Sequence, residues 1–271
     1  MNTDIFKKTM KISYLITYLG LLTYSVFLSA DDKMPLSANK QLTTIITERW
    51  DYSLRENPMS ATHAGVEKYN HLLNRVSSVD NNRRLDAEKV FFNRLTSINV
   101  SALTAENRIN HQLLKWVLEQ EIEGYQLNLS RIPLTTFSSF FMSVLNMANG
   151  LPMTSVKDYQ DYISRLNDIP RYFNENIDNM RTGIKTNFTL PKIVVEGIFP
   201  TVMAQVYKDP TKSSLYKPFI KISGDISAEN QNKLRVSAKK AILQSAIPAF
   251  KSFADFFGGE YLAAATDTLG A

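Results

Sequence analysis

The sequence predicts an all-α protein, a multi-helix array, from three observations. Residues 150–184 carry apolar side chains mainly at steps of three, four or seven, which lays one apolar stripe along a helical surface. No run alternates apolar and polar residues as a half-buried strand does. Helix-length amphipathic segments are separated by short breaks rich in proline, glycine and asparagine. The segment 150–184 is therefore expected to be the core helix against which the others pack.

The stripe of this central segment is formed by Val156, Tyr159, Ile163, Leu166, Phe173, Ile177, Met180 and Ile184. Thr154, just after Pro152, is the expected N-cap, and Gly183 is the expected stop. Pro170 is expected to kink or split the helix, because proline lacks the N–H that bonds back one turn and its ring crowds the preceding carbonyl.

The N-terminal residues 1–30 are typical of an export signal, with three lysines before an apolar run over residues 12–28. Ala30 offers a small residue at which cleavage is expected. A retained N-terminal membrane anchor is the alternative, since about 17 apolar residues are at the short limit for spanning a bilayer. Residues 31–271 are therefore expected outside the cytoplasm, periplasmic or secreted, and free of the membrane after cleavage.

Three helices are predicted in the first half of the chain. The first covers residues 37–57 and ends before Pro58, because the residue before a proline is pushed out of the helical region. The second covers about residues 80–95, and the third starts at Thr104, a good N-cap. The side that this third helix is expected to bury consists of Ile109, Leu113, Trp116, Val117 and Gln120.

Residues 130–150 are rich in aromatic residues and carry almost no charge, especially between Phe137 and Met147. Such a segment is either a buried short helix or the lining of an apolar cleft.

The second half of the chain is predicted to contain a short helix over residues 192–197 and a long surface excursion over residues 208–224, where breakers accumulate. The last long helix begins after Ser227, is kinked at Pro248, and ends at Gly258.

Composition excludes several classes of function. The 271 residues are 44% hydrophobic, enough for a real core. Residues 1–30 hold three lysines and one aspartate, +2 of the formal +5, so the rest carries +3, spread along the chain. This mild excess does not indicate a nucleic-acid binder. The absence of cysteine excludes disulfides, thiolate catalysis, cysteine-bound zinc and a lipidated N-terminal cysteine.

Five segments, in this order, resemble the N-terminal half of the bacterial family DUF885: residues 55–65 (RENPMSATHAG), 161–170, 190–197 (LPKIVVEG), 247–250 and 259–262. The resemblance extends over about residues 40–265. It implies an all-helical, gluzincin-like zinc metallopeptidase fold in an exported protein, here in a soluble periplasmic form because there is no cysteine to carry a lipid.

The resemblance also implies where the chemistry lies. The family's zinc motif, of the His-Glu-x-x-Pro-Gly-His kind, is expected C-terminal of the segment that corresponds to Tyr261, and none of the three histidines here precedes a glutamate. Residues 31–271 are thus expected to be a truncated, N-terminal substrate-channel or scaffold part with no catalytic residue. Its partners are expected to be the missing C-terminal catalytic region, which would hold the zinc, and a peptide substrate. The alternative is a noncatalytic periplasmic scaffold that binds a peptide or protein through residues 137–147.

One local pattern resembles a metal site. His63, Glu67 and His71 are spaced at i, i+4 and i+8, which on a continuous helix would bring two imidazoles and a carboxylate to one face. Pro58 and Gly65 interrupt the segment, so solvated or hydrogen-bonded histidines are the favoured interpretation.

Other acidic and histidine side chains have structural interpretations. Glu119, Glu121 and Glu123 are expected on a solvated helix face, and His111 is expected to be structural or exposed. Glu196 lies in an apolar stretch, where a carboxylate needs a partner or has a raised pKa. An ion pair with an arginine is expected for it, with a catalytic role as the alternative.

Overall fold

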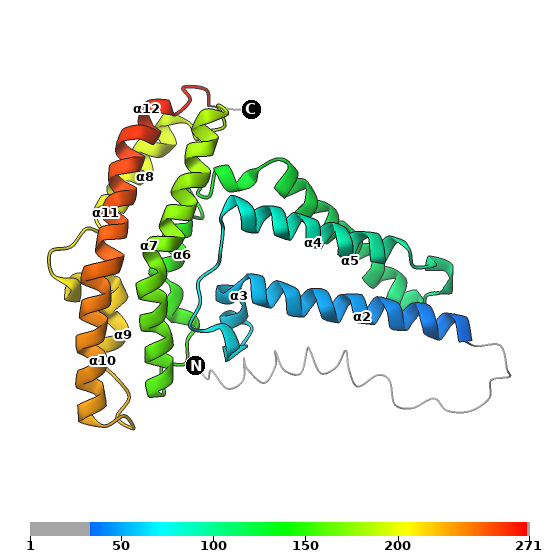
Figure 1. Ribbon diagram of the computed structural model, residues 1–271, viewed down its shortest axis with the longest axis horizontal. Coiled ribbons are helices and arrows are strands. Elements are labelled where there is room, and N and C mark those ends of the chain that lie inside the picture. Colours follow the sequence, from blue (N-terminus) through cyan, green and yellow to red (C-terminus); the bar gives the residue numbers. More distant parts are fainter. Residues whose placement is uncertain (1–32, 270–271) are drawn as a thin grey trace.

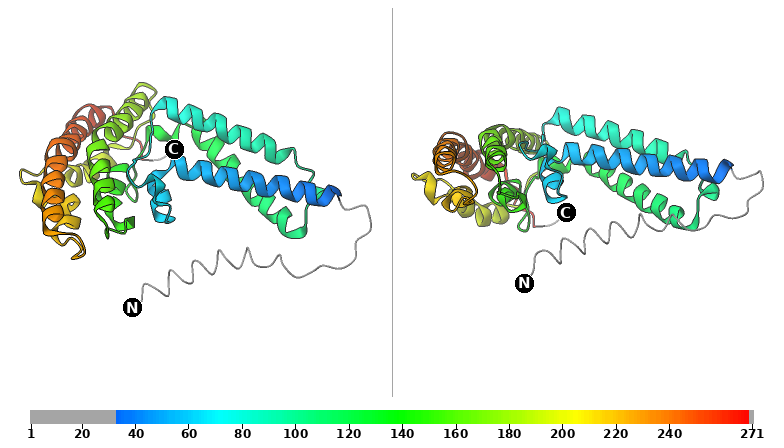
Figure 2. Two further views of the ribbon diagram at one scale, coloured as in Figure 1. Left: turned by 60° about the horizontal axis from the view of Figure 1, so that its bottom comes forward. Right: turned by 90° about the horizontal axis from the view of Figure 1, so that it is seen from below.

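The computed structural model describes residues 33–269, which form two lobes (Figure 1). The smaller lobe, here called the arm, consists of α2 (Lys33–Glu56), α4 (Ser78–Thr96) and α5 (Ala105–Gln126). The larger lobe, the body, consists of residues 129–269, and the arm projects from it in both views of Figure 2. The described residues contain two isolated β-bridges and no sheet, so the all-α prediction is confirmed for them.

The expected export signal, residues 1–30, lies outside the described residues. Within residues 33–269, no helix combines the length and the apolar character needed to cross a bilayer.

The arm has a small core of its own, formed by Ala38, Leu42, Ile45, Phe91, Leu95, Ile98, Leu103 and Leu118. His111 on α5 is buried beside this core, and its Nε2 lies 3.0 Å from the carbonyl oxygen of Leu95. The prediction that His111 is structural is therefore confirmed.

The predicted buried side of α5 is wrong. Leu118 is 0% exposed, whereas Trp116 is 61% exposed and Ile109 and Leu113 face solvent with it. At about 100° per residue, Trp116 and Leu118 are about 200° apart on the helix. Both sides of α5 carry large apolar residues, so periodicity alone could not tell which side contacts α4.

Helix α7 (Val156–Lys185) is the central helix of the body, as predicted. Most of its predicted stripe is fully buried, and the remaining members are partly buried. Its N-cap is Ser155 rather than Thr154, because Ser155 forms a capping box with Asp158. The helix is not split at Pro170 and runs past Gly183 to its end at Lys185.

The last long helix is built from three α-helical pieces joined without loops. They are α10 (Ala228–Ala241), α11 (Ile247–Phe256) and α12 (Leu262–Ala264), and the joints are π-helical turns at Ile242–Ala246 and Phe257–Tyr261. In a π-turn the backbone hydrogen bonds join residues five apart instead of four, so the turn holds one extra residue and is wider.

These π-turns accommodate two residues that were expected to kink or end the helix. Pro248 is the second residue after the first turn, where the widened backbone tolerates its missing N–H. Gly258 lies in the second turn, against the ring of Phe199 from α8 (Lys192–Met203). A Cβ at position 258 would be 2.4 Å from that ring, so only glycine permits this packing.

Three further short helices complete the described α-helices: α3 (Pro58–His63), α6 (Phe140–Leu145) and α9 (Lys217–Ile220). Residues 208–224, predicted as a surface excursion, instead bury Leu215, Phe219 and Ile222 in the body core. The helix after Pro191 is longer than predicted, because α8 continues through Pro200.

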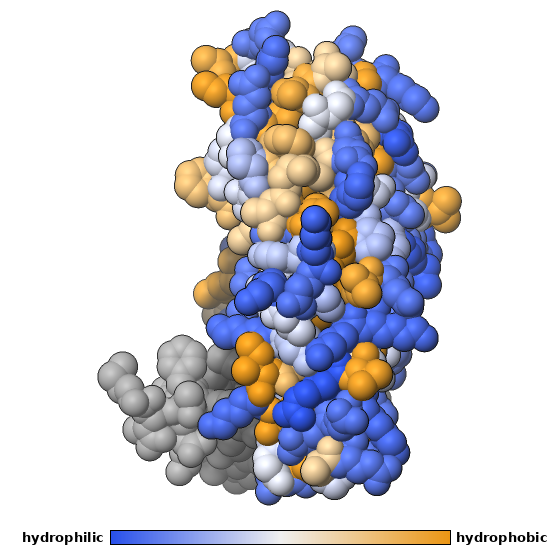
Figure 3. Space-filling view, turned by 90° about the vertical axis from the view of Figure 1, so that its left-hand side faces the viewer, coloured by the Kyte–Doolittle hydropathy of each residue, from blue (hydrophilic) through white to orange (hydrophobic). Residues whose placement is uncertain are grey.

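Edge-to-face aromatic contacts hold α6, α7 and α11 together. The ring centroid of Phe140 lies 5.0 Å from that of Phe173 and 4.9 Å from that of Phe253. Such pairs add about 0.5–1.5 kcal/mol each beyond the burial of their area. The core thus lies between the helices of the body. On the outer side, drawn in Figure 3, hydrophilic side chains cover most of the lower half and hydrophobic ones gather in the upper half.

Candidate functional site

Polar side chains of α7 hold the linker, residues 72–77, that leads from the α3 region of the chain to α4. All of these contacts are to the main chain of the linker, so they fix its path without involving its side chains. The contacts are Arg165 Nε to Leu72 O (2.9 Å), Arg171 Nη2 to Asn74 O (3.2 Å), Val76 N to Glu175 Oε2 (2.7 Å) and Asn179 Nδ2 to Val76 O (2.6 Å).

Arg165 is the most deeply buried of these side chains, with 1% of its surface exposed. Its Nη2 also donates to Thr62 Oγ1 at 2.6 Å and to Pro58 O at 3.2 Å, so one guanidinium joins α3, the linker and α7. Burial lowers the pKa of Arg165 to about 10, with the charge of Asp161 opposing that shift. The side chain is therefore still protonated at neutral pH.

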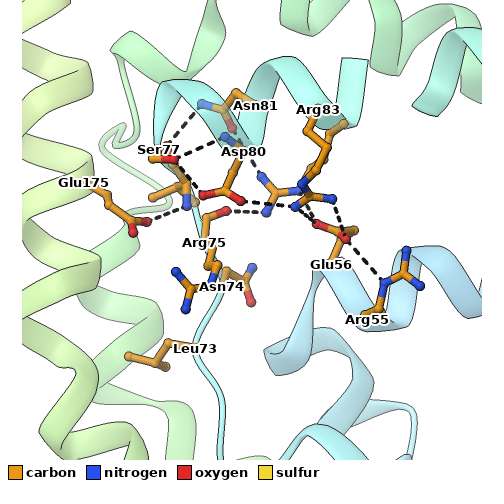
Figure 4. A network of polar contacts seen from close by, with 12 residues as sticks. Arg55, Glu56, Leu73, Asn74, Arg75, Ser77, Asp80, Asn81, Arg83 and Glu175 are labelled. Carbon is orange, nitrogen blue, oxygen red and sulfur yellow. Dashed lines mark hydrogen bonds and ion pairs between the residues drawn. The ribbon is translucent and has the colours of Figure 1, made fainter. Parts of the chain in front are cut away.

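A second polar cluster joins the end of α2 to the start of α4 (Figure 4). Arg83 donates both terminal nitrogens to the carboxylate of Glu56, at 2.8 and 2.6 Å, and Arg84 Nε donates to the same carboxylate at 3.2 Å. Burial alone would raise the pKa of Glu56, but the hydrogen bond and charge of Arg83, with the charge of Arg84, hold it below its usual value. Arg84 also donates to the carbonyl oxygen of Arg75, which ties this cluster to the linker.

Between the linker on one side and α6 on the other lies a groove, here called the interlobe groove. It consists of three adjoining pockets of about 440, 320 and 80 Å³. The two larger pockets share Ser138, Ser139, Ser143 and Tyr172. The two smaller ones share Asn81, Ser130 and Asn179. The groove therefore follows the junction of the two lobes along α7.

The groove is polar and carries little charge. Its described lining contains neither aspartate nor glutamate, includes one arginine, Arg131 in the smallest pocket, and is rich in asparagine and serine. Asn176 and Asn179 are buried at its base, and burial raises the pKa of the neighbouring Tyr172 to about 12. This phenol stays uncharged over the physiological range. Such a lining offers uncharged hydrogen-bond donors and acceptors beside aromatic rings.

The aromatic-rich segment 137–147 combines the two predicted possibilities. Phe140, Phe141, Val144 and Met147 are buried in the body core. Phe137 is 100% exposed, and it lines the groove together with the exposed Met142. The segment thus supplies both core and groove wall.

The structure does not bring His63, Glu67 and His71 onto one helix face. α3 ends at His63, Gly65 follows with φ +78°, and Glu67 lies in a separate short 3₁₀ turn. All three side chains are exposed, and His63 Nδ1 lies 2.7 Å from the carbonyl oxygen of Met59. Residues 33–269 contain no group of three His, Cys, Asp or Glu side chains placed to hold a metal ion, and His63, Glu67 and His71 do not form one.

The remaining acidic candidates lie on the surface. Glu119, Glu121 and Glu123 are exposed, and Glu119 pairs with Lys115 at 3.5 Å, which confirms the predicted solvated face. Glu196 is exposed on α8, so the expected burial against an arginine is wrong. The stretch around Glu196 is apolar but lies on the surface, since only Val195 and Val202 of α8 are buried.

The polar residues of α7 that hold the linker or line the groove were not predicted from the sequence. Arg165, Asn176 and Asn179 lie on the buried surface of α7, between members of its apolar stripe. A buried polar side chain needs a hydrogen-bond partner, so polar residues that interrupt an apolar stripe were the available signal.

The fold and the groove define a class: an all-α, two-lobed protein whose described residues carry a neutral groove at the lobe junction. Within that class, the chain belongs to the family DUF885, described as "Bacterial protein of unknown function", whose model matches residues 58–271. The arm helix α2 precedes the matched region.

Among solved structures, the chain is similar to a protein of Colwellia psychrerythraea described as a "putative lipoprotein", with a TM-score of 0.74 and 15% identity. The match covers 84% of this chain and 42% of that one, so this chain spans less than half the length of that protein. At this identity the likeness shows a shared fold. No curated protein matches the chain.

Proposed function

We propose that this chain is the substrate-binding, scaffold part of an exported hydrolase of the zinc-metallopeptidase type, and that its interlobe groove binds a peptide in extended form. In this proposal the described residues bind and orient the peptide and carry out no step of its hydrolysis. Zinc and the catalytic groups belong, in this proposal, to a C-terminal catalytic region outside the described residues.

The neutral, amide-rich lining of the groove is the observation that carries the proposal. An extended peptide presents one N–H and one C=O at every residue, and these groups need partners once water is displaced. An asparagine carboxamide offers both a donor and an acceptor, and a serine hydroxyl does the same. Phe137 and Met142 add exposed apolar surface at the groove wall for side chains of the peptide.

A noncatalytic scaffold that binds a peptide or protein partner is the second candidate. It rests on the same groove, because a groove that binds a peptide through main-chain hydrogen bonds does so whether or not the peptide is hydrolysed. The two candidates differ in whether the intact native protein hydrolyses what it binds. Export is part of both, supported by the signal-like residues 1–30 and by the description of the Colwellia protein as a "putative lipoprotein".

The groove is tested by blocking it. Ser143 lines both larger pockets from the exposed side of α6, so Ser143→Arg places a long side chain in the groove without disturbing the core. Ser237→Arg is the matched control, because Ser237 is exposed on α10 and lines none of the described pockets. Binding of a neutral, end-capped peptide library to the full chain is measured by calorimetry.

We expect Ser143→Arg to weaken peptide binding by about tenfold or more, equivalent to about 1.4 kcal/mol or more, and Ser237→Arg to leave it unchanged. Absence of binding to the unmodified chain, or equal binding by both variants, overturns the groove as the peptide site. If the chain retains stoichiometric zinc after dialysis, the proposal that the peptide-binding residues and the zinc site belong to different regions is overturned.

A further inference from the structure

A further pocket of about 630 Å³ adjoins the interlobe groove. Asn146, which follows α6, lines both this pocket and the largest pocket of the groove, so the two meet at this residue. The opposite wall is α9 with the residues that follow it.

This pocket differs from the groove in its charge. Lys217 and Lys221 both line it, four residues apart on and just after α9, and both are exposed to solvent. No aspartate or glutamate belongs to its described lining. Among the ion pairs of residues 33–269, none includes either lysine.

Two acidic side chains directly neighbour pocket-lining residues in the chain, Asp158 beside Tyr159 and Asp225 beside Gly224. The Oδ2 of Asp158 accepts hydrogen bonds from the main-chain N–H groups of Thr154 and Ser155, at 2.9 and 2.8 Å. These bonds cap α7, and with the Ser155 hydroxyl they lower the pKa of Asp158 against the opposing effect of burial. The Oδ2 of Asp225 accepts a hydrogen bond from the Ser223 hydroxyl at 3.2 Å, and neither carboxylate is among the ion pairs of the described residues.

We propose that this lysine pocket binds a carboxylate of the peptide held in the interlobe groove, either its C-terminal carboxylate or that of an acidic side chain. The inference rests on the proposed function and adds a direction to it, since a carboxylate at one end fixes which way the peptide lies. Two ammonium groups on one wall satisfy both oxygens of a carboxylate, and Asn149 and Ser214 supply neutral partners in the same pocket.

The test compares three peptides of the same neutral sequence, all acetylated at the N-terminus. The first ends in an amide, the second in a free carboxylate, and the third ends in an amide but has one glutamine replaced by glutamate. Their affinities for the full chain are measured by calorimetry at low and at high salt. The variant chain is Lys217→Gln/Lys221→Gln, and the matched control is Lys40→Gln/Lys89→Gln, which removes two exposed lysines from the arm.

We expect at least one carboxylate peptide to bind about three- to tenfold more tightly than the amide peptide, the size of effect that two exposed charge pairs produce together. The gain is expected to disappear in the pocket variant, to persist in the arm control and to shrink at high salt. The free-carboxylate and glutamate peptides separate the two possible sources of the carboxylate.

Equal affinity for all three peptides, or a gain that survives in the pocket variant, overturns the carboxylate pocket and leaves the groove standing. Failure of all three peptides to bind the unmodified chain overturns the proposed function and this inference together. Thermal unfolding of both variants is the control for folding, and no change is expected because all four lysines are exposed.

Discussion

Replacing Arg165 by methionine is expected to destabilise the chain by about 3–5 kcal/mol, because it leaves buried neutral acceptors without their donor. The change keeps the length of the side chain and removes its donors. Four acceptors lose a charge-assisted hydrogen bond, at 2.6 Å for Thr62, 2.9 Å for Leu72, 3.2 Å for Pro58 and 3.4 Å for Tyr69. Each such bond contributes about 1.5–3 kcal/mol, and their sum is offset in part by relief from burying an unpaired charge.

Two measurements test this reasoning. Chemical denaturation gives the free energy of unfolding, and amide hydrogen exchange reports local opening, which is expected to rise first over residues 58–76. Arg165→Lys is the control for charge, and is expected to recover only part of the stability because an ammonium cannot reproduce the guanidinium fork. A loss below about 1 kcal/mol in Arg165→Met, with unchanged exchange in residues 58–76, would refute the role of Arg165 as the anchor of the linker.

Three further predictions concern the fold. Gly258→Ala is expected to destabilise the chain by about 1–3 kcal/mol through overpacking against α8. Gly259→Ala, with open space around its Cβ, is expected to have little effect, and thermal unfolding of the two variants measures the difference. Glu56 has a pKa below that of the unfolded chain, so its contribution is complete above pH ~5 and is lost as the pH falls through its folded-state pKa. Glu56→Gln should therefore be less stable than the parent by about 1.5–3 kcal/mol at neutral pH, with the difference vanishing in acid; a constant difference would contradict this. Trp116→Gln is expected to change stability by less than about 0.5 kcal/mol and Leu118→Ala to cost about 2–4 kcal/mol, and the reverse order would restore the face of α5 predicted from sequence.

The sequence was a good guide wherever one physical cause dominated. The stripe of α7 was predictable because a buried helix repeats its apolar residues at the helical period. The helix after Thr104 was predictable from its N-cap, and Thr104 Oγ1 does accept a hydrogen bond from Asn107 N at 3.3 Å. The side of α5 that faces the arm core was not predictable, because apolar residues occur on both of its sides and the neighbouring helices decide between them.

The groove could not be predicted because it is made by segments far apart in the chain. The contact between Val76 N and Glu175 spans 99 residues, and the one between Arg165 and Pro58 spans 107. No local pattern contains both partners of such a pair. The π-turn before Pro248 shows the same limit within one helix, since a proline predicts a disturbed helix but not the manner in which the backbone absorbs it.

The contacts between α7 and the linker have an evolutionary consequence. Because α7 bonds only to the N–H and C=O groups of residues 72–76, the exposed positions 72 and 75 tolerate nearly any side chain, whereas Leu73 is 3% exposed in the body core and Val76 packs against that core. Mutations can accumulate at positions 72 and 75 at little cost, while the polar positions of α7 stay under purifying selection. Divergence between members of the family is thus expected to be faster at these two linker positions than at the polar positions of α7.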